Sequence, residues 1–256
     1  MNRIDKKFKE LKENGKKALI PYICSGDPSI EMTEKLVYTL EEAGADIIEL
    51  GIPFSDPLAD GPVIQAAGLR AFASGYRLAD TFKVVENVRK TSEIPLVIMV
   101  YYSSIIGFGK EEFLDKCVKS DVDGLIIPDL PYEEYDEFKP MVDKTGIYMI
   151  PLVGLTSGDR IPMIVKEAKG FVYCVSSMGV TGVRKEFDSR VEGFVREVKK
   201  HTDTPACIGF GISSKEDIDK FEAYADGCIV GSAIVRKIFD CGCDLDKVKE
   251  FVKGLK

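Results

Sequence analysis

The chain has 256 residues, and its 35 basic and 42 acidic side chains give a net charge of −7. This acidic balance, without a basic stripe, argues against a nucleic-acid-binding protein. No apolar run reaches the roughly 20 residues that span a membrane, and the first residues lack the apolar core of a signal peptide. Seven scattered cysteines fit reduced thiols in the cytoplasm. We therefore expect a cytoplasmic protein without membrane association.

The lone histidine, His201, limits the possible chemistry. A zinc site built on histidines is impossible, and a Ser-His-Asp or Cys-His arrangement would have to use this one residue. The Cys241-Gly242-Cys243 segment is too isolated for a metal site. None of the apolar runs described below contains a lysine, which excludes a Schiff-base aldolase. We expect no metal, and the remaining acid–base groups are carboxylates and tyrosines.

Eight short apolar runs alternate with charged segments of helical periodicity. The runs comprise residues 18–26, 46–52, 95–102, 124–130, 147–153, 170–176, 205–211 and 227–235. Near-continuous apolar runs are typical of parallel strands covered on both faces. Eight strand–helix units without a linker predict an α/β protein, a (β/α)8 TIM barrel formed by one domain over residues 1–256. The alternative that the same alternation permits is an open doubly wound sheet.

Three segments depart from the regular repeat. Residues 1–16 predict an extra N-terminal helix, with Ile4, Phe8 and Leu11 on one face that could cover the bottom of the barrel. The second and third runs begin 49 residues apart (95 minus 46), and the excess predicts an extended loop at 53–75. The Gly-rich residues 176–187 follow the sixth run and predict a mobile lid. Both loops would lie at the C-terminal face, where barrels carry function.

Two helix starts carry local signals. Asp27 followed by Pro28 is typical of an N-cap with proline at the first helical position. Ser213 and Glu216 have the spacing of a capping box. Each pair predicts a helix that begins directly after a strand.

Two carboxylates are candidates for acid–base catalysis. Glu49 stands in the apolar run DIIELGI, where a charge is costly unless it is paired or functional. If it faces the barrel interior, desolvation raises its pKa toward the range of a general acid. The alternative is a buried ion pair. Asp60 follows in SDPLADGP, where an Asp beside Gly and Pro is commonly a turn former.

Glycines near the seventh and eighth runs predict a phosphate site. Gly209 and Gly211 precede a helix opened by Ser213, and Gly231 and Ser232 end the last run. Glycine allows close backbone approach, and helix N-termini present free N–H groups to an anion. These two loops commonly form a phosphate site in (β/α)8 barrels. We therefore expect a small phosphorylated substrate.

Long stretches of the chain resemble the tryptophan synthase alpha chain family. The resemblance rests on AGADIIELGIPFSDPLADGPVIQ at 43–65, LRAFASG at 69–75, PDLP at 128–131, VSSMGVTG at 175–182 and GFGIS at 209–213. It implies a lyase that cleaves indole-3-glycerol phosphate into indole and glyceraldehyde 3-phosphate. It also implies no cofactor in this chain, and a pyridoxal-phosphate-bearing beta chain that takes the indole for L-tryptophan synthesis in an α2β2 heterotetramer.

The resemblance also implies roles for individual residues. Glu49 matches the catalytic glutamate, Asp60 the catalytic aspartate, and Tyr173 a tyrosine that helps to position the glutamate. Further matches are the lid residue Thr181, the phosphate contacts Gly182, Gly211, Ile212, Gly231 and Ser232, and the indole-pocket residues Ile64, Tyr101, Phe210 and Tyr22. The chain departs from the family at Ser103-Ser104, where Asn-Pro is common. The resemblance therefore supports contacts from that loop, including any to the partner, less strongly than the other matches.

These roles fit a retro-aldol cleavage. Glu49 is expected to protonate the indole ring at C3, and Asp60 to accept a hydrogen bond from the ring N–H. We expect low activity for the isolated chain and a large rise with the beta chain. The alternatives are another phosphosugar-binding barrel enzyme, which would typically use a strand lysine, and a non-catalytic phosphate-binding barrel that regulates a partner.

Overall fold

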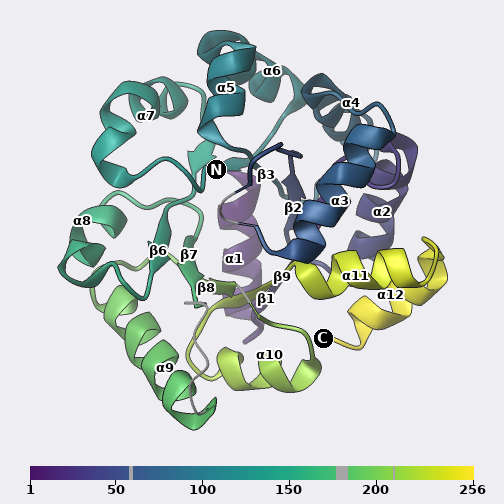
Figure 1. The fold of residues 1–256 in the computed structure, drawn as a ribbon. Coiled ribbons are helices and arrows are strands. Elements are labelled where there is room, and N and C mark those ends of the chain that lie inside the picture. The colour runs from purple at the N-terminus through teal and green to yellow at the C-terminus, as the bar shows by residue number, and fades with distance from the viewer. Residues whose placement is uncertain (58–59, 177–183, 210) are drawn as a thin grey trace.

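A ring of parallel strands forms the centre of the molecule (Figure 1). The computed structural model describes residues 1–57, 60–176, 184–209 and 211–256, with the backbone alone at 184–188. Within these ranges the strands are β1 (Ala18–Cys24), β2 (Ile48–Gly51), β3 (Leu96–Met99), β4 (Gly124–Ile126), β5 (Tyr148–Met149), β6 (Leu152–Gly154), β7 (Val172–Val175), β8 (Ala206–Gly209) and β9 (Gly227–Val230).

The strand order closes the sheet into a barrel. The order is β5-β4-β3-β2-β1-β9-β8-β7-β6. β1 and β9, the first and last strands along the chain, are therefore neighbours and pair in parallel. β5 and β6 are two parts of one barrel strand, interrupted at Pro151, which has no N–H for the ladder. Ile150 still donates to the Leu125 carbonyl and Tyr173 to the Pro151 carbonyl, at 2.8 and 2.9 Å. The predicted (β/α)8 barrel is confirmed, and the open doubly wound sheet is excluded.

Helices surround the ring on its outer face (Figure 1). They are α1 (Arg3–Glu13), α2 (Ile30–Glu42), α3 (Pro62–Ala73), α4 (Leu78–Val88), α5 (Tyr102–Phe108), α6 (Lys110–Ser120), α7 (Tyr135–Asp143), α8 (Ile161–Val165), α9 (Arg184–Lys200), α10 (Lys215–Glu222), α11 (Ser232–Asp240) and α12 (Leu245–Lys253). Short 3-10 turns at Tyr132–Glu134 and Gly158–Arg160 precede α7 and α8.

Helix α1 is the exception, because it lies across one end of the ring (Figure 1). Ile4, Phe8 and Leu11 are buried there among inward-facing strand residues. The Phe8 ring lies 6.0 Å from the ring of Phe171, measured between centroids. The Asn2 side chain caps the helix by accepting from the Ile4 N–H at 2.9 Å. The predicted N-terminal helix is therefore present, and it closes the bottom of the barrel.

Alternation along β2 determines which side chains face the barrel interior. Ile48 and Leu50 belong to the core between the strands and the outer helices, whereas Ile47 belongs to the core inside the ring. Glu49 has the same parity as Ile47 and so also points inward, one layer higher. Apolar side chains fill the lower layers, and the cavity described below lies above them.

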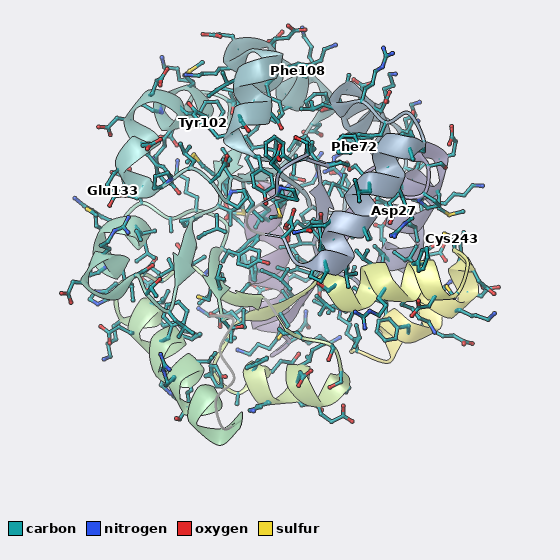
Figure 2. All side chains as sticks on the ribbon, viewed as in Figure 1. Asp27, Phe72, Tyr102, Phe108, Glu133 and Cys243 are labelled. Atoms are coloured by element: carbon teal, nitrogen blue, oxygen red, sulfur yellow. The ribbon has the colours of Figure 1, made fainter. Side chains whose placement is uncertain are left out.

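Both predicted helix starts are wrong in detail. Helix α2 begins at Ile30 and is capped by Ser29, whose Oγ accepts from the Met32 N–H at 3.2 Å. Asp27, labelled in Figure 2, does not cap it. Its carboxylate instead accepts from Arg70 Nε and Nη2 at 2.8 and 2.7 Å. Helix α10 is capped by Ser214, one residue after the predicted Ser213.

The segment expected as an extended loop contains a helix. Helix α3 occupies most of residues 53–75, and Gly61 stands at its N-cap with Pro62 at the first helical position. The buried side chains of α3 are small, because Ala67, Gly68 and Ala71 form its inner face. This face allows the segment to pack against the barrel, and it places Asp60 directly before the helix.

Candidate active site

A cavity of about 490 Å³ opens at the C-terminal ends of the barrel strands. Inward-facing residues of five strands form its floor: Tyr22, Glu49, Met99, Tyr173 and Ile229. Its other lining residues come from the loops and helices above, namely Asp60, Gly61, Ile64, Gly211, Ile212, Ser213, Gly231, Ser232, Ala233, Arg236, Lys237, Asp240 and Phe251. This is the face at which (β/α)8 barrels carry active sites.

Glu49 is the most buried charged side chain of the cavity, with 1 % of its surface exposed. Neither of its carboxyl oxygens has a hydrogen-bond partner among the described residues. Desolvation raises its pKa to about 8, and the nearby negative charge of Asp60 contributes to the rise. The alternative of a buried ion pair is therefore wrong within the described part of the chain. An unpartnered buried carboxyl is costly, and such groups concentrate at functional sites.

Asp60 lies on the segment between β2 and α3 and is partly buried. Its backbone N–H donates to the Pro57 carbonyl, and its carbonyl accepts from Gln65 Nε2 at 2.8 Å. Burial raises its pKa to about 6, against the lowering effect of a hydrogen bond from Tyr101. Asp60 thus combines the predicted turn with a carboxylate that lines the cavity.

Two tyrosines lie against glycines at the cavity floor. An ideal Cβ on Gly51 would lie 2.0 Å from the Tyr22 hydroxyl, and one on Gly209 would lie 2.4 Å from the Tyr173 ring. Contacts this close are impossible for a real side chain, so only glycine fits at either position. Burial raises the pKa of both tyrosines well above the usual value. Both phenols are therefore neutral at physiological pH.

Of the predicted indole-pocket residues that the structure describes, two line the cavity and one does not. Ile64 and Tyr22 line the cavity, as expected. Tyr101 is not among the lining residues, because its hydroxyl bonds Asp60 and its ring stacks on Phe54 with centroids 4.7 Å apart. Tyr101 thus contacts the cavity-lining carboxylate of Asp60, and its predicted place in the indole pocket stays a prediction. Tyr173 lines the cavity, but no hydrogen bond to Glu49 forms within the described residues.

Four of the five predicted phosphate residues, all except Gly182, line the cavity. Gly231 is the N-cap of α11 and Ser232 its first residue. Gly211 has a φ of +79°, a conformation that favours glycine, and Ile212 follows it. The first N–H groups of a helix have no acceptor within the helix and are directed outward from its end. The cavity thus joins a buried and a partly buried carboxylate, Glu49 and Asp60, to a helix end suited to an anion.

Sequence reasoning missed several lining residues. Met99 and Ile229 complete the apolar floor, and Arg236 and Lys237 extend the phosphate end along α11. The spacing of Arg236, four residues after Ser232, was a signal that both share a helix face. An isolated basic pair on an amphipathic helix is also typical of a solvated surface, so the signal was weak.

Some predicted residues lie outside the described part of the chain. These are Phe210, Thr181 and Gly182, together with residues 177–183 of the expected lid at 176–187. His201 bonds Glu197 at 3.0 Å after α9, remote from the cavity-lining residues. All seven cysteines are free thiols. No group of three or more potential metal-ligating side chains occurs among the residues that the structure describes.

Comparisons with known proteins identify the family. The family model for the tryptophan synthase alpha chain matches residues 8–254. The chain belongs to the tryptophan synthase alpha chain family. It is 52% identical to the alpha chain of Thermoanaerobacter sp. strain X514, over 100% of this chain and 99% of that protein. It is 50% identical to that of Clostridium beijerinckii, over the full length of both.

Solved structures of the family share the fold. Tryptophan synthase subunit alpha from Legionella pneumophila str. Paris has a TM-score of 0.92 at 36% identity, over 100% of this chain and 97% of that chain. A chain of tryptophan synthase from M. tuberculosis in its aminoacrylate-bound form has a TM-score of 0.90 at 30% identity, over 100% and 98%. The expected family and fold are confirmed.

Membership defines the activity. The chain is a lyase of tryptophan biosynthesis that cleaves indole-3-glycerol phosphate into indole and glyceraldehyde 3-phosphate. It works with a beta chain in an α2β2 complex, and the beta chain carries the pyridoxal phosphate. Neither alternative, another phosphosugar enzyme or a non-catalytic barrel, agrees with this finding. Across the described residues, no helix combines the length and apolar character needed to cross a membrane.

Proposed function

We propose that Glu49 is the general acid–base of the cleavage and that Asp60 stabilises the charge developing on the indole ring. The observation that carries this assignment is the Glu49 carboxyl, which is 1 % exposed and has no partner among the described residues although it lines the cavity. Asp60 lines the same cavity and raises the Glu49 pKa through its charge. The two groups are therefore electrostatically coupled across the space that would hold the substrate.

The pKa values support different roles for the two carboxyls. Glu49, with a pKa of about 8, is mostly protonated at neutral pH and can donate a proton. Asp60, with a pKa of about 6, is mostly ionised and can accept a hydrogen bond. Pairs of titratable groups whose environments separate their pKa values commonly divide into acid and base.

The proposed reaction has two proton transfers. Glu49 donates its proton to C3 of the indole ring, and the positive charge moves to the ring nitrogen, whose N–H bonds the Asp60 carboxylate. The Glu49 carboxylate then removes the proton from the hydroxyl on the carbon attached to C3. That oxygen becomes the aldehyde of glyceraldehyde 3-phosphate, and the electron pair of the broken carbon–carbon bond returns to the ring. Glu49 regains its proton and indole is released.

The ends of the cavity support a single substrate orientation. Apolar Ile64, Met99 and Ile229 suit the indole ring, whereas Gly211, Ile212, Gly231 and Ser232 suit the phosphate. Backbone N–H groups at the start of α11 bind an anion without requiring a basic patch. We propose that these contacts hold the substrate with its C3 atom near Glu49.

Replacing each carboxyl by its amide tests the assignment. General acid–base catalysis contributes about 10²- to 10⁴-fold, so Glu49→Gln should lower indole release by at least about a hundredfold. Asp60→Asn should also be severely impaired. Glycerol 3-phosphate binding should persist in both variants, because the phosphate contacts are unchanged. Glu197→Gln and Asp115→Asn, exposed residues in helical ion pairs, serve as matched controls.

Three outcomes would count against the roles proposed for Glu49 and Asp60. Normal turnover by Glu49→Gln contradicts the general acid–base role. A nearly full rate for Asp60→Asn leaves Asp60 as a turn former only. Loss of glycerol 3-phosphate binding in either variant points to a disturbed cavity, and then the rate alone does not support the assignment.

We also propose that the beta chain raises the rate of this chain. Asp60 lies between β2 and α3 and lines the cavity at the mouth of the barrel, where a partner can contact the loops around the substrate. Indole release measured with and without a beta chain tests this; equal rates would contradict it. We propose, in addition, that residues 1–256 act as one catalytic domain in the cytoplasm, which fragment expression and cell fractionation would test.

A further inference from the structure

The phosphate end of the cavity carries basic side chains that the proposed mechanism does not use. Five residues of α11 line the cavity: Ser232, Ala233, Arg236, Lys237 and Asp240. Ala233, Arg236, Lys237 and Asp240 follow Ser232 by one, four, five and eight residues, so all five lie along one side of the helix. One side of α11 thus borders the cavity from the phosphate site outward, for two turns of the helix.

Arg236 is well placed to reach the first turn of α11. It follows Ser232 by four residues, a rise of about 6 Å along the axis. Side chains on a helix tilt toward its N-terminus, so the long Arg236 side chain is directed back toward the turn that begins at Ser232. Its guanidinium can therefore approach a phosphate bound there.

Neither basic residue is engaged in an ion pair within the described ranges. The Lys237 ammonium instead lies 5.8 Å from the centroid of the Phe251 ring. Asp240 has the i,i+4 spacing that could neutralise Arg236, but the two side chains form no ion pair in the described part of the chain. By contrast, Arg3, Arg70 and Arg89 each bind a carboxylate. The positive charge of Arg236 is therefore available to a ligand.

The charge of the expected ligand exceeds what backbone groups supply. A phosphate monoester carries about two negative charges at pH 7, whereas a helix N-terminus corresponds to about half a positive charge. The chain itself has a net charge of −7, which opposes the approach of an anion. The unpartnered, buried Glu49 at the other end independently marks this cavity as a ligand site.

We propose that Arg236 binds the phosphate of indole-3-glycerol phosphate through charge-assisted hydrogen bonds, and that Lys237 adds only a weaker, through-space attraction. This inference rests on the proposed function, because it assumes that the phosphate occupies the N-terminus of α11. It adds a side-chain cation to a site otherwise built from glycine, serine and backbone N–H groups.

Steady-state kinetics of the α2β2 complex tests the role of Arg236. Arg236→Gln should raise KM for indole-3-glycerol phosphate by about tenfold, equivalent to one charge-assisted hydrogen bond, with kcat within about twofold. Arg236→Lys should recover part of the loss, and Lys237→Gln should change KM less than Arg236→Gln. Arg196→Gln, which removes an exposed arginine paired with Glu192 on α9, is the matched control.

The salt dependence of KM separates charge from packing. Salt screens the attraction between charged groups, so KM of the unmodified complex should rise as the ionic strength increases. In Arg236→Gln this rise should be smaller, whereas Arg196→Gln should retain it. The inhibition constant of glycerol 3-phosphate should follow the same pattern. A KM and a salt dependence equal to those of the control would overturn the proposal.

A substitution in the phosphate site itself separates a failure of the Arg236 proposal from a failure of the proposed phosphate position. Ser232→Asp places a negative charge at the first turn of α11, where an acidic residue is compatible with the helix. If Ser232→Asp raises KM strongly and Arg236→Gln does not, only the role of Arg236 is wrong. If Ser232→Asp also leaves KM unchanged, the phosphate lies elsewhere and both inferences are wrong.

Discussion

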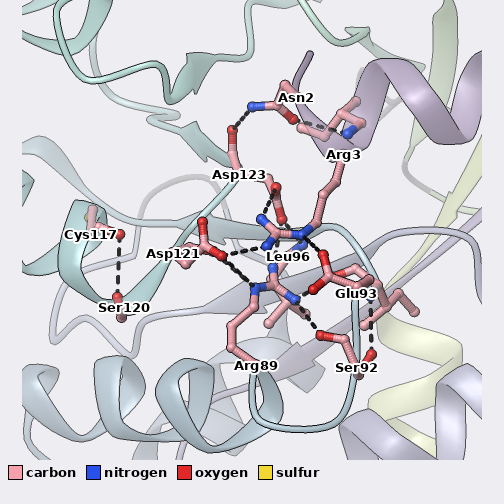
Figure 3. Close-up of polar contacts among 12 residues, drawn as sticks. Asn2, Arg3, Arg89, Ser92, Glu93, Leu96, Cys117, Ser120, Asp121 and Asp123 are labelled. Atoms are coloured by element: carbon pink, nitrogen blue, oxygen red, sulfur yellow. Dashed lines mark hydrogen bonds and ion pairs between the residues drawn. The ribbon is translucent and has the colours of Figure 1, made fainter.

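Two buried carboxylates at opposite ends of the barrel show how the same burial serves different purposes. Asp123 precedes β4 at the end of the barrel that α1 covers, and Glu49 lies on β2 below the cavity. They are 3 % and 1 % exposed. Asp123 accepts from Arg3 and Arg89 at 3.1 and 2.6 Å and from the Leu96 N–H at 2.8 Å (Figure 3). Glu49 has no such partner among the described residues.

The difference lies in how each site compensates the loss of water. At Asp123, burial raises the pKa, and Arg89, the Leu96 N–H and Arg3 oppose the rise. The network also joins α1 to the loops before β3 and β4 (Figure 3). At Glu49 no group among the described residues opposes desolvation, and the pKa rises to about 8. One end of the barrel thus uses a buried charge to hold elements together, and the other keeps a buried carboxyl mostly protonated at neutral pH.

The largest predicted effect on stability is at Asp123. Asp123→Ala leaves Arg89, which is only 8 % exposed, without its closest carboxylate. Breaking a buried pair commonly costs about 3–5 kcal/mol, so we expect a loss of this size in the free energy of unfolding. Chemical denaturation measures it, and kcat of the folded protein should stay close to normal. Asp121→Asn removes the charge of an exposed partner of the same arginines and keeps a side chain that tolerates the φ of +64° at this position, so it should cost less than about 1 kcal/mol.

Glu49→Gln should stabilise the chain, in contrast to Asp123→Ala, and the gain in the free energy of unfolding should depend on pH. The folded-state pKa of about 8 lies above the ordinary value of 4.5. The folded chain therefore binds this proton more tightly, and its stability falls as pH rises from 4.5 to about 8. Relative to the unmodified chain, Glu49→Gln should gain more than about 1.4 kcal/mol between pH 5 and 8, the equivalent of one pKa unit. A pH-independent difference would contradict the unpaired state of Glu49.

A substitution beside Glu49 should affect both folding and catalysis. Gly51→Ala places a methyl group where the Tyr22 hydroxyl lies, so the tyrosine must shift within the cavity. Overpacking of this kind costs about 1–3 kcal/mol, and we expect kcat/KM to fall by about tenfold or more. Gly193→Ala is the matched control, because its added methyl group meets no neighbour within 4 Å. Equal kinetics for the two variants would show that Tyr22 does not need its present position.

The smallest effect is expected at Tyr101. Its hydrogen bond lowers the pKa of Asp60, so Tyr101→Phe should raise that pKa above about 6. The acidic limb of the pH–rate profile should then move upward by less than about one unit, while the basic limb, assigned to Glu49, stays in place. Tyr38→Phe, which removes a hydroxyl bonded to Asn87 on the outer helices, should leave both limbs unchanged. Movement of the basic limb instead would contradict the assignment of the two limbs.

Much of the cavity could be predicted from sequence because its signals are local. Glu49 stands out in an apolar strand, and strand parity places it on the same side as Ile47. Gly231 and Ser232 lie where a last strand meets a helix, a position that needs only the order of elements. The contact of Tyr101 depended instead on packing across elements. Tyr101 follows β3 but bonds Asp60 from the segment after β2, a pairing that spacing along the chain does not show.

By itself, the sequence determined the repeated strand–helix pattern and the closed barrel that eight such units favour. It also showed Glu49 as an acidic residue within an apolar strand. These features follow from hydrophobic periodicity and turn chemistry, which act over a few neighbouring residues. Only the tertiary structure decided which buried charges obtain partners. Arg3 lies 120 residues from Asp123, yet it neutralises that carboxylate, and no comparable cation meets Glu49 in the described part of the chain. Charge compensation depends on distance in space, so folding alone determines where a buried carboxyl stabilises the barrel and where it can transfer a proton.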